Sequence, residues 1–386
     1  MYGSYGLRSA PTNGFHNMPL TLNDLRRFAI TRSLFKPTTL KRAIHKLGFV
    51  QADPIRAPAR AQDLTLRHRV VGYRAGDLER HYPTLGIEED FFVNYGFVPR
   101  DTHALMHPRT PHTAWPKARV TQAEAIRHYV VEHGIVHPRA VDTHFAHGKV
   151  VSGFGGSSNA TTRLLDDMHY RGLLRVARRE RGIRLYAARA ASPAPPDAQA
   201  AHDALLDVIV AKYAPLPAAT LGHLLSLLRG GAPQWHGERH GTLQRAKQRL
   251  AHARVEGVDW YWPVGERIPQ SEAAKHEPDD TVRLLAPFDP LVWDRRRFEL
   301  FWGWAYRFEA YTPAPKRKLG YYALPLLWRD AVIGWGNVSI NNDKRGNNLV
   351  SNFGYAKGKA PRDAAFRRGL EEEVERMSAF LGLSTA

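Results

Sequence analysis

Cysteine is absent from this 386-residue chain, so disulfide bonds, thiolate metal sites and a cysteine nucleophile are excluded. Long apolar runs are missing too: no stretch of about 18 uncharged apolar residues, the minimum for a membrane-spanning helix, occurs. We therefore expect no membrane segment. Residues 1–18 are rich in glycine, serine and asparagine and lack the apolar core of a signal peptide, so we expect a flexible tail there.

Acidic residues are scarce relative to basic ones. The chain has 37 aspartates and glutamates against 55 lysines and arginines, which gives a net charge of +18 and a pI near 10.2. Such a surplus favours a polyanionic partner, because each phosphate contact releases counterions. An arginine-rich composition that serves only solubility is the alternative. We favour nucleic acid, since the arginines gather in clusters along the chain.

Residues 121–190 have the pattern of a winged helix. Thr121 and Glu124 have the spacing of a capping box, and helical spacing of apolar residues follows. The three predicted helices cover residues 121–133, 138–146 and 159–171. Two short apolar runs around a charged turn then predict a hairpin over 173–187 with its tip at 179–182. In a winged helix the third helix enters a groove and the hairpin is the wing. The arginines of this wing are Arg175, Arg178, Arg179, Arg181 and Arg184.

Similar patterns occur before and after this unit. The predicted helices of the flanking units cover residues 20–33, 38–47, 199–213, 217–228 and 241–255. A proline-rich linker at 191–197 and a strand at 258–262 complete the third unit. We therefore divide the chain into helix-turn-helix units at 19–120, 121–190 and 198–265.

The last part of the chain differs in character. Short strands are predicted at 284–285, 321–328, 331–339 and 349–353, with turns at 329–330 and 341–347. An apolar stripe from Phe366 to Leu381 predicts a closing amphipathic helix that packs on a core. The expected fold class is mainly α with β: tandem winged-helix motifs followed by a C-terminal antiparallel β-rich domain at 281–386.

Three sequence blocks carry a resemblance to a known family. They are LGFVQADPI at 47–55 with ARA at 59–61 and LRHR at 66–69, LLAPFDPLVWDRRR at 284–297, and YRFEAYTPAPKR at 306–317 with GYY at 320–322. Together they resemble the crosslink-repair DNA glycosylases called YcaQ-like or AlkZ-like, over roughly residues 20–383. The resemblance implies tandem winged helices, a C-terminal β-rich domain, and excision of N-alkylated purines, interstrand crosslinks included. It also implies that no metal or organic cofactor is needed.

The family's active site carries a glutamine, an apolar residue and then an aspartate or glutamine, and Gln51-Ala52-Asp53 matches this triplet. An alkylated purine is already a cationic leaving group, so the reaction mainly needs a stabilised oxocarbenium ion and a positioned water. Asp53 can supply the negative charge and accept the proton, and Gln51 can orient water or sugar. The competing interpretation is structural, since an aspartate before proline often caps a turn. No lysine lies within the motif, which argues against a Schiff-base lyase step.

One segment departs from the family's pattern. Many members have an aromatic, histidine and glutamate segment of the type YWAHEA where this chain has NYGFVPR at 94–100. Only the tyrosine persists. We therefore expect this part of the pocket to be remodelled, with a consequence for lesion specificity.

Basic side chains near these motifs are candidates for phosphate contacts. Aromatic residues, Trp293 and Tyr321, accompany two of the basic clusters, a pattern that suits backbone contact with stacking. The predicted DNA-binding residues are Arg60, Arg67, Arg69, Arg178, Arg179, Arg181, Arg295, Arg296, Lys316 and Arg317. For any single arginine, a solvated helix face is the alternative.

The histidines have spacings that metal ligands can have. The two candidate groups are His103, His107 and His112, and His144 with His147. No HExxH motif and no cysteine supports them, and chance explains such spacings in a chain with 19 histidines. We expect no metal site. No GxxxxGK[ST] motif occurs, so ATP-driven chemistry is not expected either.

The leading hypothesis is a monofunctional DNA glycosylase that hydrolyses the N-glycosidic bond of N-alkylated purines, including bulky or crosslinked ones. Its expected partner is double-stranded DNA with such bases, and we expect a monomer in the cytoplasm, associated with the nucleoid. A non-catalytic winged-helix regulator, which would usually dimerise on paired half-sites, is the alternative. An RNA-binding protein is a weaker third.

Overall fold

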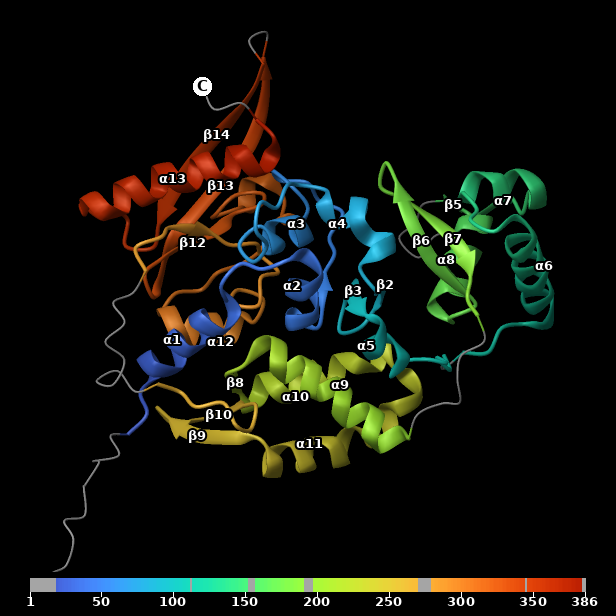
Figure 1. Ribbon diagram of the computed structural model, residues 1–386, viewed down its shortest axis with the longest axis horizontal. Helices are drawn as coiled ribbons and strands as arrows, with labels where there is room; N and C mark the ends of the chain where they lie inside the picture. Colours follow the sequence, from blue (N-terminus) through green and yellow to red (C-terminus); the bar gives the residue numbers. More distant parts are fainter. Residues whose placement is uncertain are drawn as a thin grey trace, which may run out of the picture.

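The computed structural model describes residues 19–383 except 112, 152–156, 191–196, 270–278 and 344–345. The expected tail at 1–18, nearly all of the linker at 191–197 and most of the glycine-rich turn before residue 159 therefore lie outside the described residues. Within the described part, no helix is long and apolar enough to cross a membrane. Figure 1 shows the N-terminal segment in the centre, with the other three parts of the chain around it.

The N-terminal segment combines short helices with a small sheet. Its elements are α1 (Leu22–Ser33), α2 (Leu40–Leu47), β1 (Val50–Gln51), α3 (Ala61–Leu66), α4 (Asp77–His81), η1 (Tyr82–Thr84), β2 (Ile87–Phe91), β3 (Tyr95–Pro99) and α5 (Arg100–Ala104). The two predicted helices are confirmed. Gly48, with φ of +65°, ends α2 and turns the chain into β1. The sheet is antiparallel in the order β1-β3-β2, with Gln51 opposite Gly96. A Cβ at Gly96 would overlap the Val50 carbonyl oxygen, so only glycine lets the two strands approach this closely.

The next unit has the predicted order of three helices and a hairpin. Its elements are α6 (Lys117–His133), α7 (Pro138–Phe145), β4 (Lys149–Val151), β5 (Ser157–Asn159), α8 (Ala160–Tyr170), β6 (Leu174–Glu180) and β7 (Ile183–Ala188). Arg181 and Gly182 both have positive φ, as the two-residue turn of a type I′ hairpin requires. The predicted capping box is wrong. The helix begins after Pro116, so Thr121 lies inside it, and the Thr121 hydroxyl donates to the Lys117 carbonyl (3.3 Å).

The third unit contains α9 (Ala198–Tyr213), β8 (Leu216–Pro217), α10 (Ala218–Gly231), η2 (Pro233–Glu238), α11 (Arg239–Arg249), β9 (Ala251–Val255) and β10 (Val258–Trp262). The strand predicted at 258–262 is confirmed. The helix predicted over 241–255 is wrong in its last part, because residues 251–255 form β9 instead. These residues pair with β10 across a two-residue turn, and the ladder satisfies their backbone groups.

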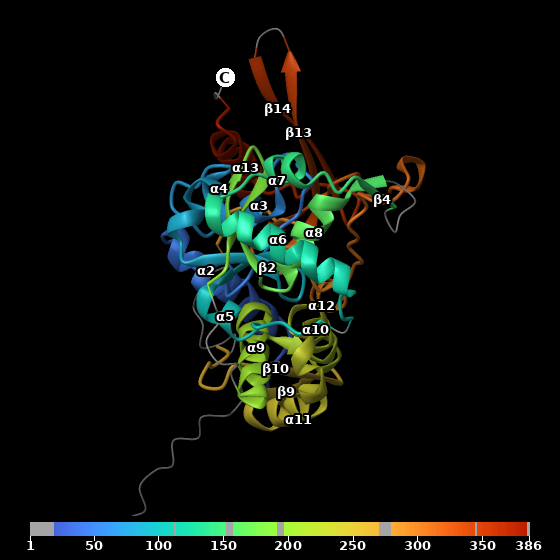
Figure 2. The ribbon, with the colours of Figure 1, turned by 90° about the vertical axis from the view of Figure 1, so that its right-hand side faces the viewer.

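The C-terminal part contains β11 (Arg283–Leu284), α12 (Arg295–Trp302), η3 (Ala314–Lys316), β12 (Leu324–Trp328), β13 (Ala331–Asp343), β14 (Gly346–Tyr355) and α13 (Ala364–Leu381). The four strands form an antiparallel sheet in chain order. The turn predicted at 341–347 is shorter than expected, since strand pairing continues to Asp343 and Gly346. The β13–β14 hairpin therefore extends beyond the body (Figures 1 and 2). The closing helix is confirmed, with Phe366, Met377 and Phe380 buried.

Two apolar cores connect these parts. One joins α2, the β1–β3 sheet, the 117–188 unit and the C-terminal sheet. The other joins α1 with α9, α10 and α12. The N-terminal segment contributes to both, so residues far apart in sequence surround β1. The observed class, mixed helices with antiparallel sheets, agrees with the expected α+β class.

Candidate active site

Gln51 and Asp53 lie side by side at the end of β1 and are nearly buried, with 6% and 9% of each residue exposed. The Asp53 Oδ1 atom accepts a hydrogen bond from the Ile55 backbone N–H (2.8 Å), and the Asp53 N–H donates to the Gln62 Oε1 atom (3.3 Å). The interpretation that Asp53 caps a turn is therefore correct for its Oδ1 atom. Burial raises the pKa of Asp53, and the hydrogen bond from Ile55 opposes this.

Trp293 orients the Gln51 side chain. The indole Nε1–H donates to the Gln51 Oε1 atom (3.0 Å), and the indole packs on Tyr213 with 5.4 Å between ring centroids. This contact joins the first and second sequence blocks across 242 positions. It uses the amide oxygen of Gln51, so the NH₂ group is the end that can donate to a ligand.

Tyr322, from the third block, faces the same place. Only 3% of the residue is exposed, and among the described residues its hydroxyl has no hydrogen-bond partner. Burial is the largest cause that raises the pKa of Tyr322, and the negative charge of Asp53 is the second. Buried hydroxyls are normally hydrogen-bonded, so a free one beside a desolvated carboxylate indicates a binding site. Sequence reasoning quoted Tyr322 within its motif but assigned it no role.

A cavity of about 380 Å³ is connected to Gln51 and Tyr322 through two of its wall residues, although none of Gln51, Asp53 and Tyr322 lines it. Trp293 forms part of its wall, and Phe308, another wall residue, packs edge-on against Tyr322 with 5.1 Å between ring centroids. The other lining residues are His223, Pro287, Phe288, Val292, Asp294, Arg295, Arg296 and Tyr306. The wall is largely aromatic and two exposed arginines lie at its edge, an arrangement that suits a flat base next to phosphates. His223 comes from α10, and no sequence signal pointed to it.

Three predicted DNA contacts are wrong because internal partners occupy the side chains. Arg69 is fully buried and makes a bidentate ion pair with Asp289 (2.7 and 3.0 Å). Arg67, with 4% of its side chain exposed, pairs with Glu373 of α13. Arg60 pairs with Glu79 and lies against the hairpin turn, where a Cβ on Gly182 would approach its Nη2 atom to 2.6 Å. These arginines join elements of the fold instead of reaching the surface.

The wing is only partly available to DNA. Arg179 forms a bidentate ion pair with Glu89 of β2, whose side chain is fully buried, so the prediction for Arg179 is wrong. Arg175 likewise pairs with Glu88 (2.8 Å) and Arg184 with Asp166 (2.9 Å). Arg178 pairs only with its neighbour Glu180, with 43% of the side chain exposed, and Arg181 is exposed at the turn. Arg178 and Arg181 thus remain the predicted phosphate contacts.

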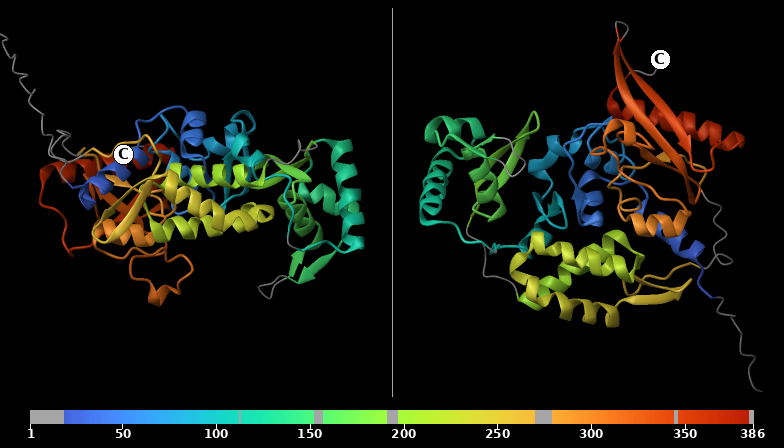
Figure 3. Two further views of the ribbon diagram at one scale, coloured as in Figure 1. Left: turned by 90° about the horizontal axis from the view of Figure 1, so that it is seen from below. Right: turned by 180° about the vertical axis from the view of Figure 1, so that it is seen from behind.

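The other predicted contacts are at the surface. Arg295, Arg296 and Lys316 are exposed, and Arg317 lies over the Tyr321 ring at 4.9 Å. Figures 2 and 3 show the loop that contains η3 and the β4–β5 hairpin projecting from the same face of the molecule, at opposite ends. We expect DNA to lie along this face.

The wing predicts a defined salt dependence. Replacing Arg178 and Arg181 together with alanine should flatten the slope of log K against log salt by up to about 2 units for an undamaged duplex, since each lost phosphate contact removes about 0.9. Fluorescence anisotropy at several sodium chloride concentrations measures this slope. As a matched control, Arg254→Ala removes an exposed arginine from the third unit and should leave the slope unchanged. An unchanged slope in the double variant would show that these two arginines of the wing do not contact DNA phosphates.

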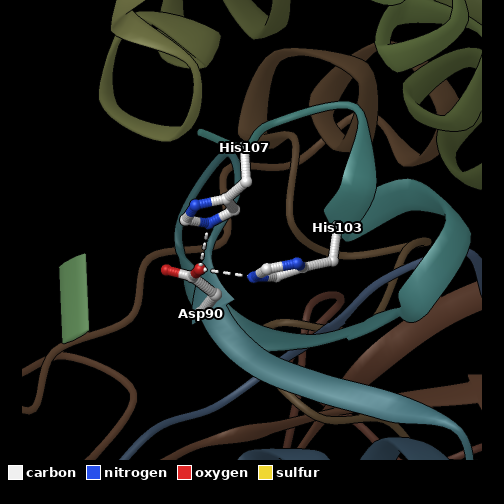
Figure 4. A group of neighbouring side chains, drawn as sticks. All are labelled: Asp90, His103 and His107. Carbon is white, nitrogen blue, oxygen red and sulfur yellow. Dashed lines mark hydrogen bonds and ion pairs between the residues drawn. The ribbon is translucent and has the colours of Figure 1, made fainter. Parts of the chain in front are cut away.

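A second polar cluster lies on β2 (Figure 4). The Asp90 Oδ2 atom accepts hydrogen bonds from the Nε2 atoms of His103 (2.9 Å) and His107 (2.8 Å), and the two imidazole rings stack at 4.1 Å. Burial lowers the pKa of both histidines, that of His107 to about 3, and the hydrogen bonds to Asp90 oppose this shift. The partner of the two histidines is therefore Asp90, which the histidine spacing did not reveal.

The charges around this cluster favour a structural role over a metal site. Residues of these types could hold a cation. However, Arg109 contacts the Asp90 Oδ1 atom (3.1 Å) and Arg189 contacts His103 (3.2 Å), and two guanidinium groups oppose a divalent ion. Arg109 also donates to the carbonyls of Tyr170 (2.6 Å) and Gly231 (2.7 Å). The cluster thus fastens α8 and α10 to the sheet that carries Gln51.

One lysine lies close to the motif in space. The Lys212 amine, from α9, donates to the Phe49 carbonyl at the entry to β1, and burial lowers its pKa to about 7. The sequence argument, that no lysine lies within the motif, does not exclude a lysine brought near it by the fold. With 3% of the residue exposed and its amine on a backbone carbonyl, Lys212 is positioned to support β1.

The segment that departs from the family's pattern is β3, which lies directly beside β1. Phe97 is buried in the core, and the Tyr95 hydroxyl donates to Glu89 (2.8 Å). Neither residue lines the aromatic cavity. This segment therefore pairs with β1 within the sheet, and the cavity wall comes from the second and third blocks together with His223.

Two comparisons with known proteins match most of this chain. The family model described as "DNA glycosylase AlkZ-like" matches residues 44–380. Among solved structures, the DNA glycosylase AlkZ of Streptomyces sahachiroi is similar, with a TM-score of 0.58 and 15% sequence identity over 95% of this chain and 98% of that one. At this identity the structural likeness shows the fold, whereas the family match spans most of the chain. This chain belongs to the AlkZ-like DNA glycosylase family.

Proposed function

We propose that this protein excises N-alkylated purines from double-stranded DNA, bulky and interstrand-crosslinked bases included, by hydrolysis of the N-glycosidic bond. The observation that carries the proposal is that three separate sequence blocks meet here: Trp293 of the aromatic cavity wall holds Gln51, and Tyr322, which packs on the wall residue Phe308, is close enough to Asp53 to be affected by its charge. Membership of a DNA glycosylase family supports the reaction class. Tandem winged helices that present Arg178, Arg181 and the loop around η3 to the duplex complete the proposal.

Asp53 is the proposed catalytic carboxylate. One of its oxygens is held by the Ile55 N–H, which fixes the orientation of the group. The other oxygen can face the sugar, where its negative charge stabilises the developing oxocarbenium ion and accepts a proton from the attacking water. Desolvation strengthens this interaction, because a charge acts over a longer range in a medium of low dielectric constant.

Gln51 and Tyr322 are proposed to position the water and the sugar. The Gln51 amide, held by Trp293, offers its NH₂ group as a donor. The Tyr322 hydroxyl can donate to the sugar or to the water, which would satisfy its hydrogen-bonding capacity. The purine leaves as a neutral base, so no strong acid is required, and the buried Lys212 is not proposed as a nucleophile.

The direct test is release of free base from duplex DNA that carries a single N7-methylguanine, compared with a bulkier N7-alkyl adduct and an interstrand crosslink. Chromatography with mass detection should find the free base, and strand breaks should appear only after alkali treatment. Release of the base with no strand breaks before alkali treatment supports a monofunctional hydrolase. Tight sequence-specific binding with no release from any of the three substrates would favour the winged-helix regulator instead.

Trp293→Phe tests the positioning of Gln51. The variant keeps an aromatic wall and removes the indole N–H, so we expect the single-turnover excision rate to fall by roughly tenfold, the size of one hydrogen bond. Gln51→Ala should lose about as much. If the two residues act together, the double variant should be no slower than Gln51→Ala alone. Additive losses would show that Trp293 acts independently of Gln51.

A further inference from the structure

A second cavity, of about 630 Å³, lies between the 117–188 unit and the segments that precede and follow it, and it shares no lining residue with the aromatic cavity. The α6 helix, the end of α8, the end of β7 and the segment before α6 surround it. Its polar lining consists of the four arginines Arg109, Arg127, Arg171 and Arg189 and one carboxylate, that of Glu124. Arg109 is neutralised by Asp90, which leaves three guanidinium groups against a single negative charge.

Arg189 lacks a carboxylate of its own. Its Nη2 atom is 3.8 Å from Glu88, but Glu88 already accepts from Arg175 (2.8 Å) and Arg100 (3.1 Å). Among the described residues, the buried Nε–H of Arg189 has no hydrogen-bond partner. A buried donor without an acceptor is unfavourable, and an anion in the cavity is the kind of group that would relieve it.

The other two arginines are also poorly compensated. Arg171 donates to the Thr113 carbonyl (2.7 Å) and lies over the Trp115 ring at 4.1 Å. Arg127 is exposed and has no ion-pair partner in the part of the chain that the structure describes. Burial, the largest cause, lowers the pKa of both Arg171 and Arg189, and the charges of Asp167 and Glu88, respectively, oppose this shift.

We propose that this cavity binds a phosphate group. Guanidinium groups donate paired hydrogen bonds that match phosphate oxygens, and three of them converge here. The volume lies in the range of ligand sites, so a phosphate group carried by a larger molecule can enter. The phosphate can come from the DNA backbone outside the lesion or from a free phosphate-bearing molecule. The inference rests on the proposed function only if the phosphate comes from DNA; binding of a free phosphate-bearing molecule would not depend on it.

The test compares the variant Arg127→Gln/Arg171→Gln with the matched control Arg139→Gln, which removes an exposed arginine from α7 of the same unit, outside the cavity. In one arm, inorganic phosphate is added at constant ionic strength and the thermal midpoint is compared with that in chloride. In the other arm, the salt slope of binding to an undamaged duplex is measured. Arg127→Gln alone keeps the test valid if the double variant is unstable in chloride, since its side chain has no structural partner to lose.

A phosphate-dependent rise in the thermal midpoint that is lost in the cavity variant supports the site. If the cavity variant also flattens the salt slope by about 0.9 or more, the phosphate belongs to DNA. If phosphate protects but the slope is unchanged, the source is a free phosphate-bearing ligand. The inference is overturned if neither quantity distinguishes the cavity variant from Arg139→Gln. Excision of N7-methylguanine is assayed separately, so its failure would not be confused with failure here.

Discussion

Asp53→Asn should lower the single-turnover rate of N7-methylguanine excision by roughly 10²-fold or more, because removing a charge aimed at the transition state typically costs several kcal/mol. Asparagine keeps the shape of the side chain and can still accept the hydrogen bond from the Ile55 N–H. Folding and the local turn should therefore persist. DNA affinity should change little, since the proposed phosphate contacts lie elsewhere.

The matched control is Asp63→Asn. Asp63 is another buried carboxylate of the same segment, 5% exposed, and it accepts hydrogen bonds from Tyr73 (2.7 Å) and the Gly76 N–H (3.2 Å). Loss of excision in Asp53→Asn with an unchanged thermal midpoint, and not in Asp63→Asn, would identify the charge at position 53 as the cause. If the Asp53→Asn variant were fully active, the only role left for Asp53 would be to cap the turn through the Ile55 N–H.

The same experiment has a pH arm. Burial raises the pKa of Asp53, and the ionised form is the one that can stabilise a cation. Excision should therefore decline as the pH falls through a value above the ordinary range of an aspartate, and recover as the pH rises. Rates are corrected for spontaneous base loss. Asp53→Asn should show no such acid limb, because it has no group that titrates there.

Asp289→Ala should destabilise the protein by about 3–5 kcal/mol, because it leaves the fully buried Arg69 guanidinium without its counterion. Arg69 also donates to the carbonyls of Ser33 (2.8 Å) and Thr65 (2.6 Å), so it cannot swing out to solvent without breaking further bonds. Because Asp289 lies in the same block as Trp293, excision should suffer as well. Urea titration followed by tryptophan fluorescence measures the loss.

Asp259→Ala is the control for this prediction. It removes a carboxylate from the exposed Arg254–Asp259 pair, whose side chains are 69% and 47% exposed, and should change stability by about 0–1 kcal/mol. The apolar pair Arg69→Met/Asp289→Leu should recover part of the loss, since the penalty comes from an unpaired buried charge. A small effect of Asp289→Ala would show that Arg69 finds another partner or that water reaches it.

Local patterns in the sequence determined much of the secondary structure. The helical spacing before Gly134, the Arg181-Gly182 turn and the apolar stripe from Phe366 to Leu381 depend only on residues near one another in the chain, and each was confirmed. One local pattern was misinterpreted. Residues 251–255 form a strand, not the end of a helix, because they pair with β10 across the two-residue turn at 256–257.

The arginines illustrate the limit of sequence reasoning about the site. The sequence shows the charge of each side chain, but it does not show which side chain of opposite charge will lie next to it. Arg69 and Asp289 are 220 positions apart, and Arg179 and Glu89 are 90 apart, so only the fold could turn these predicted phosphate contacts into buried ion pairs. Burial favours pairing of opposite charges so strongly that a partner brought near by the chain outcompetes solvent and DNA.

The sequence by itself determined the family, the strong positive charge and the candidate pair Gln51 and Asp53, because motifs and composition are properties of the chain. Only the tertiary structure decided which groups come near that pair: the Trp293 indole, the Tyr322 hydroxyl, which has no hydrogen-bond partner among the described residues, and through them a cavity wall built from the second and third blocks and His223. The physical reason is that desolvation and hydrogen bonding act between atoms a few ångströms apart, however many residues separate them along the chain.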